Sequence, residues 1–204
     1  MNTNALHVRR PRRPHAAFTL VEVTITIAIA AIAGSALLLG ATASIQTTDE
    51  AMQRTIADGI ARQLIDEILG NRYAAPGTGG HDVTLGPSAW ESSGSGRERY
   101  NDIDDYNAVR IAPPEDPYGI ALGKDDGEGG LRHLNFQAPA DFLENWRQEV
   151  DVYYVRESDL TTRLPLGQTT DYRVVEVRVY RNDPTGGDRE LARLRRVIAY
   201  VPPM

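Results

Sequence analysis

The stretch Ala17-Phe18-Thr19-Leu20-Val21-Glu22 decides how the rest of this 204-residue chain is interpreted. Four arginines precede it, and the 26 residues from Val23 to Thr48 that follow it carry no charge. An uncharged helix of about 20 residues is long enough to cross the hydrocarbon core of a membrane. Because the arginines lie on one side only, we expect the N-terminus to stay in the cytoplasm and the rest to lie across the membrane.

Glu22 lies near the start of this apolar segment. A charged side chain inside a bilayer is energetically costly and normally marks a function with a specific partner. One interpretation is that Glu22 pairs with a positive group on another chain. The alternative is that its side chain reaches the lipid headgroups beside the arginine-rich leader.

The order of basic leader, small residue, Phe18-Thr19-Leu20, Glu22 and long apolar helix resembles the type IV prepilin family, which includes pilins and the pseudopilins of type II secretion. The resemblance covers about residues 7–45. It implies that a membrane-embedded aspartyl peptidase cuts between Ala17 and Phe18 and methylates the new amine of Phe18. The family usually has Gly at the position of Ala17, so we expect slower cleavage here.

The same resemblance implies that Glu22 pairs with the terminal amine of a neighbouring subunit and sets the axial stagger during assembly. The chain is then predicted to be a minor pilin or pseudopilin, not an enzyme. It would be assembled with other subunits, by an inner-membrane platform, into a type IV pilus or a type II secretion pseudopilus. The precursor would be a single-pass protein of the inner membrane with its head outside the cytoplasm. The filament would be periplasmic or on the cell surface.

Two other classes of protein stay open at this point. The chain could be a single-span envelope protein that never assembles, or a secreted binding protein or enzyme whose conventional signal peptide is cut after Ala43. An enzyme is not predicted, because the sequence has no Gly-x-Ser-x-Gly, His-Glu-x-x-His or phosphate-loop pattern. No cofactor is expected.

The net charge of the chain narrows the possible partners. Residues 1–17 contain four arginines and no acid, so their removal changes the net charge from −6 to −10. Such a surface disfavours nucleic acid, which is bound through clustered Lys and Arg.

The chain has no cysteine, so no disulfide can hold the exported part together. The C-terminal end must therefore be held by strand pairing or by a metal.

The apolar helix is predicted to continue beyond the membrane, from about Phe18 to Leu69. The alternative is two helices that are broken between Gln46 and Asp49. In the second half, apolar residues recur every four positions, at Met52, Ile56, Ile60, Leu64 and Ile68. We divide the chain into a leader (1–17), a membrane and assembly helix (18–45), its amphipathic extension (46–71) and an exported head (72–204).

The C-terminal third predicts an antiparallel sheet. Strands are expected at residues 150–155, 172–180 and 191–201, and the last two form a hairpin. Minor elements are also predicted: brief strands at residues 83–85 and 108–111, and a short turn of helix at residues 140–146. A helix packed on such a sheet gives an α+β fold, which is also the architecture that the resemblance implies.

The densest acidic cluster lies between Asn101 and Asn107 and faintly resembles an Asp-rich segment in minor pilins of the mannose-sensitive haemagglutinin type. Its carboxylates, Asp102, Asp104 and Asp105, are candidate ligands for a hard cation such as Ca²⁺. The spacing does not fit an EF-hand loop. The favoured interpretation is a solvated polar loop with Asx-turns and no metal.

Overall fold

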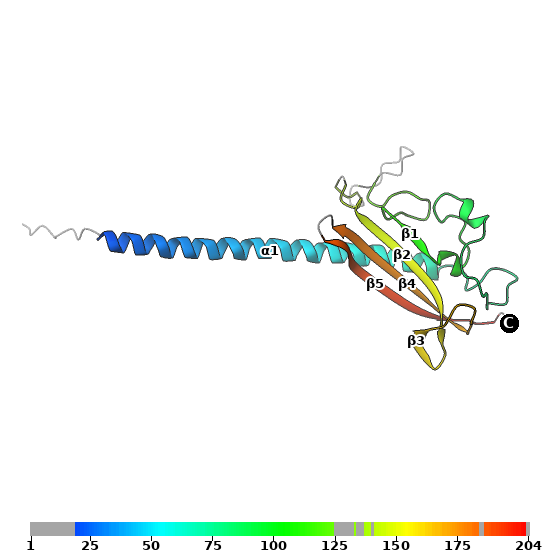
Figure 1. Ribbon diagram of the computed structural model, residues 1–204. Helices are drawn as coiled ribbons and strands as arrows, with labels where there is room; N and C mark the ends of the chain where they lie inside the picture. The colour runs from blue at the N-terminus through cyan, green and yellow to red at the C-terminus, as the bar shows by residue number, and fades with distance from the viewer. Residues whose placement is uncertain (1–18, 125–132, 134–136, 140, 184–185, 203–204) are drawn as a thin grey trace, which may run out of the picture. The chain divides into compact units, whose positions relative to one another are not determined.

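The computed structural model describes residues 19–124, 133, 137–139, 141–183 and 186–202. The fold is α+β, with one long N-terminal helix and a C-terminal antiparallel sheet of five strands (Figure 1). The chain divides into two compact units, residues 1–49 and 50–204. The helix α1 runs from Leu20 to Leu69, without the break that the alternative interpretation placed between Gln46 and Asp49.

The first unit presents an apolar helical surface. Its large apolar side chains are exposed, from 43 % at Val23 to 83 % at Leu20. The hydroxyls that interrupt the apolar run, those of Thr26, Ser35 and Thr42, donate at 2.7–2.9 Å to the carbonyl four residues earlier. Their polar groups are therefore satisfied inside the helix. By length and composition, this helix can cross a membrane.

In the second unit, α1 packs on one face of the sheet. Its buried side chains are those of Gln53, Ala57, Ile60, Ala61, Leu64, Ile65 and Ile68. The predicted stripe is wrong at its start, because Met52 is 47 % exposed and Ile56 is only partly buried. A strict four-residue spacing turns by about 40° per step around a helix of 3.6 residues per turn, so residues at the two ends of the stripe face different directions.

The sheet has the strand order β1-β2-β4-β5, and β3 pairs with the far end of β2. All pairings are antiparallel. The strands are β1 (Val109–Ile111), β2 (Trp146–Arg156), β3 (Asp159–Arg163), β4 (Tyr172–Asp183) and β5 (Gly187–Ala199). The C-terminal end is held by pairing between β4 and β5, one of the two means expected for a chain without cysteine.

The main predicted strands and the brief strand predicted at residues 108–111 are confirmed, but two minor predictions are wrong. Residues 83–85 form no strand, and residues 141–145 form a turn rather than helix before β2 begins at Trp146. Strand β3 was not predicted, since its sequence Asp159-Leu160-Thr161-Thr162-Arg163 has no run of alternating apolar residues. Its side chains are mostly exposed, so burial leaves little pattern there to detect.

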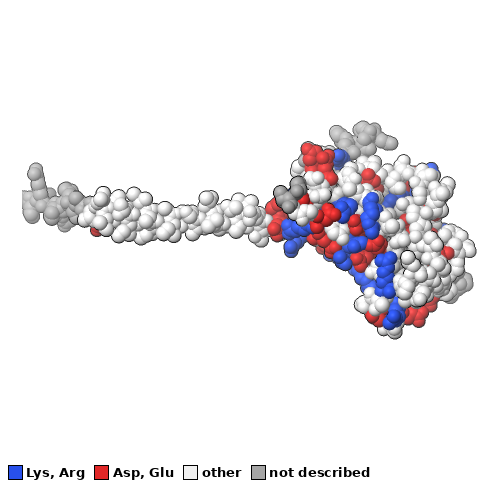
Figure 2. All heavy atoms as spheres, in the orientation of Figure 1, with Lys and Arg blue, Asp and Glu red and all other residues white. Residues whose placement is uncertain are grey.

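The two faces of the sheet differ in chemistry. On the helix side, Val150 of β2 lies opposite Val177 of β4, and both are completely buried in the core shared with α1. On the outer face, ion pairs cross the strands: Arg110 to Asp151 at 2.7 Å and Arg193 to Glu176 at 3.2 Å, while Arg178 bonds Asp151. Figure 2 shows Arg and Lys atoms interleaved with Asp and Glu atoms over the head.

Gly96 and Gly119 lie where two loop segments cross at close range. Gly96 has φ +57°, and a Cβ there would lie 2.3 Å from the backbone nitrogen of Gly119. The Arg97 N–H donates to the Pro117 carbonyl at 2.7 Å and fixes this crossing. Gly77 also has a positive φ, +88°, but a Cβ there would meet nothing within 4 Å.

Comparing Gly77→Ala with Gly96→Ala separates the cost of backbone conformation from the cost of a clash. Gly77→Ala should lower the free energy of unfolding by about 1 kcal/mol, the cost of a left-handed backbone for an L-residue. Gly96→Ala adds a clash with backbone and should lower it by about 3 kcal/mol or more. Denaturant unfolding of the full chain in detergent measures both. Equal effects would contradict the close crossing.

Candidate functional site

The Asp-rich segment is not the solvated loop that the sequence predicted. Asp102, Asp104 and Asp105 are buried, with exposures of 2 %, 6 % and 2 %. Asp102 Oδ1 accepts hydrogen bonds from the backbone N–H groups of Asp104 and Asp105, at 2.9 and 3.3 Å. Asp105 Oδ2 in return accepts from the N–H groups of Asn101 and Asp102. The Asx-turn geometry was therefore anticipated, whereas the burial was not.

The segment is buried because distant parts of the chain close around it. Asp104 Oδ1 accepts a hydrogen bond at 2.9 Å from Arg173 of β4. Tyr106 donates through its hydroxyl to Glu67 of α1 at 3.0 Å, and the Ile103 N–H donates to the Arg72 carbonyl just beyond α1. Asp104, Tyr106 and the backbone of Ile103 thus join the end of α1 to the sheet. Among the described residues, no group of three or more His, Cys, Asp or Glu side chains is placed to hold a metal ion.

The buried acids should make stability depend on pH. Burial raises the pKa of Asp102 to about 8, and the nearby carboxylates of Asp104 and Asp105 raise it too. An unfolded Asp titrates near 3.8. Between these values the folded chain binds more protons than the unfolded chain, so this contribution to stability is complete below about pH 4 and is lost as the pH rises through about 8.

We therefore expect the free energy of unfolding of wild type to fall between about pH 5 and pH 9. Asp102→Asn keeps an oxygen that accepts from the same two N–H groups but cannot ionise. The variant should gain on the order of 2 kcal/mol over wild type at the alkaline end and lose much of the slope. Denaturant unfolding of both proteins across this range is the measurement, and parallel curves would contradict the prediction.

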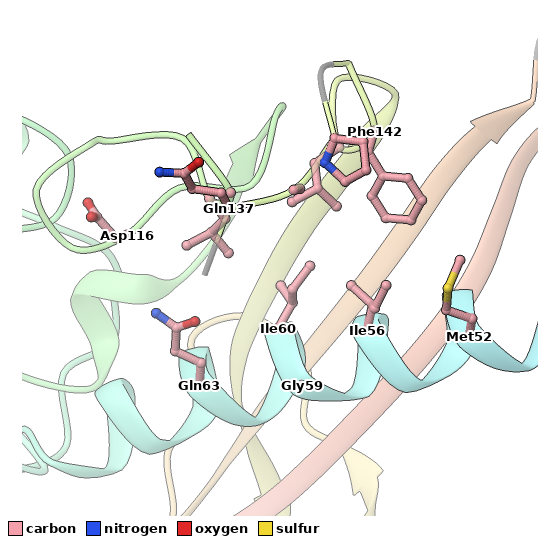
Figure 3. Close-up of a pocket in the computed structure, with 13 residues that line it drawn as sticks. Met52, Ile56, Gly59, Ile60, Gln63, Asp116, Gln137 and Phe142 are labelled. Atoms are coloured by element: carbon pink, nitrogen blue, oxygen red, sulfur yellow. The ribbon is translucent and has the colours of Figure 1, made fainter. Parts of the chain in front are cut away.

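An apolar groove of about 840 Å³ lies beside the second half of α1. Figure 3 shows the side chains of Ile56 and Ile60 rising from α1 below Phe142, with Met52 and Gly59 on the same stretch of helix. Three polar side chains, those of Gln63, Asp116 and Gln137, also line the groove, but most of its lining is apolar and includes Leu122 and Pro139. The groove therefore suits an apolar group rather than a polar substrate.

A different arrangement marks the start of α1. Glu22 Oε2 accepts hydrogen bonds from the backbone N–H of Thr19 at 2.8 Å and from its hydroxyl at 3.0 Å. The Glu22 N–H points back to the Thr19 hydroxyl oxygen at 3.3 Å. This reciprocal pattern is a capping box, in which Thr19 precedes the helix and Glu22 lies in its first turn.

The capping box keeps the carboxylate at the positive end of the helix dipole, where a negative charge is stabilised. It also gives Glu22 partners within its own chain, which the sequence reasoning missed. The signal was present as Thr-x-x-Glu immediately before an apolar run. Glu22 is the single charged residue in the sequence from Phe18 to Thr48. Ala17 and Phe18, the predicted cleavage residues, lie outside the described residues.

Residues 12–38 match the family model described as the prokaryotic N-terminal methylation motif. The chain carries the type IV prepilin leader signature. Searches of curated proteins and of solved structures gave no match. The matched segment includes the predicted cleavage residues, Thr19, Glu22 and the first part of the apolar helix.

The leader signature bears on how the chain is processed and anchored. A prepilin-type leader supports a type IV pilin-like precursor that a prepilin peptidase processes, and it implies assembly with other pilin subunits. The motif is a structural one and not that of an enzyme. Together with the apolar half of α1, the prepilin leader fits a membrane-anchored precursor.

Proposed function

We propose that this chain is a minor pilin or pseudopilin. The precursor is cut between Ala17 and Phe18, the new amine of Phe18 is methylated, and the mature subunit is assembled into a type IV pilus or a type II secretion pseudopilus. The observation that carries this proposal is the methylation motif at residues 12–38, with Glu22 inside it as the single charge of a 31-residue stretch.

Glu22 is the assembly residue in this proposal. Cleavage creates a positive amine on Phe18 near the apolar layer, and opposite charges attract strongly where the dielectric constant is low. The capping box supplies two hydrogen bonds to Oε2 of Glu22 before a partner arrives. On assembly, the terminal amine of a neighbouring subunit becomes the stronger partner, since a charge-assisted bond to a cation adds to those from the neutral Thr19.

The other parts of the chain have mechanical roles. Residues 1–17 form the leader and residues 18–45 the membrane and assembly helix. Residues 46–71 continue that helix into a head made of residues 72–204. The precursor resides in the inner membrane with its N-terminus in the cytoplasm, and an assembly platform there extracts it. A head with long loops suits a low-abundance subunit, and its negative charge argues against direct contact with nucleic acid.

The mature N-terminus tests this proposal. The chain is expressed with and without a prepilin peptidase, and its N-terminus is read by mass spectrometry. We expect N-methylated Phe18 only in the presence of the peptidase. An intact leader in both cells would instead indicate a single-span envelope protein, and a chain that begins after Ala43 would indicate a conventional signal peptide.

Changing the size of the side chain at Ala17 tests the position of the cut. Ala17→Gly should raise the rate at which the leader is removed, because glycine is the residue usually found before the cut. Ala17→Leu should leave most of the chain unprocessed, since it puts a bulky side chain at the cleaved bond. A pulse-chase measurement of leader removal gives both rates. If all three proteins were processed at the same rate, the cut would lie elsewhere.

A further inference from the structure

We draw no further inference here: the strongest candidate, the apolar groove between the head-proximal half of α1 and the loops that contain Leu122 and Phe142, carries nothing because the structure does not show what covers it.

Discussion

Replacing Arg173 with methionine is expected to lower the free energy of unfolding of the head by about 3–5 kcal/mol, because it leaves a buried carboxylate without its cation. The Arg173 side chain is completely buried in β4. Its Nη1 donates to Asp104 at 2.9 Å and to the Tyr73 carbonyl at 2.6 Å, and its Nη2 donates to the Tyr154 hydroxyl at 2.7 Å.

The guanidinium also makes cation–π contacts with two aromatic rings. Its central carbon is 4.5 Å from the centre of the Tyr73 ring and 5.0 Å from that of Tyr154. Each cation–π contact adds to the stabilisation when it is shielded from water. Arg173 therefore joins four parts of the chain: the residues just after α1, the segment around Asp104, and strands β2 and β4.

The experiment is denaturant unfolding of the full chain in detergent, followed by tryptophan fluorescence. Trp146 is buried and reports on the core, whereas Trp90 is largely exposed. Arg196→Met, at an exposed arginine of β5, is the matched control and should change stability by less than about 0.5 kcal/mol. A loss below about 1 kcal/mol in Arg173→Met would contradict the role that we assign to this residue.

A double variant separates the lost ion pair from lost packing. Adding Asp104→Asn to Arg173→Met removes the unpaired buried carboxylate while it keeps an amide of similar size. The second change should therefore recover on the order of 1–2 kcal/mol. In wild type, Asp104→Asn should instead be destabilising, because Arg173 then loses the nearer of its two carboxylate partners, at 2.9 Å, and keeps only Asp82 at 3.9 Å. A second change that costs the same in both backgrounds would show that the two residues are not coupled.

The sequence predicted the elements whose burial follows a regular pattern. The apolar run and the periodic residues after it were enough to predict one helix, and Val175, Val177 and Val179 alternate as expected of a strand with one buried face. The sequence does not predict strand β3, because most of its side chains stay exposed when it pairs with β2. Pattern reasoning detects burial, so it misses elements that are held mainly by backbone hydrogen bonds.

The candidate site was predictable only where its contacts are local. Glu22 stands out as one charge in an apolar segment, and its partner Thr19 is three residues away. The burial of Asp104 depends instead on Arg173, which is 69 residues away in sequence and comes beside it only when β4 forms. No local pattern encodes such a contact. From the sequence alone, the segment that contains these acids therefore has the pattern of a solvated loop.

The second prediction with a large effect concerns Glu22. Glu22→Ala should still insert into the membrane and lose its leader, but its incorporation into filaments should fall at least about tenfold, which corresponds to about 1.4 kcal/mol of lost pairing. In the assembly that we propose, the neighbouring subunit's terminal ammonium would then have no carboxylate to pair with inside an apolar helix bundle. The measurement is the fraction of processed subunit found in sheared or overproduced filaments.

Glu22→Gln distinguishes charge pairing from helix capping. Glutamine retains the oxygen that completes a capping box with Thr19 but carries no charge. If Glu22 acts through its charge, Glu22→Gln should assemble as poorly as Glu22→Ala. Thr19→Val removes the hydroxyl from the box but leaves both the Thr19-position N–H and the carboxylate, so it should assemble within about threefold of wild type. Normal assembly of Glu22→Gln together with failure of Thr19→Val would mean that the start of the helix, not the ion pair, is what assembly requires.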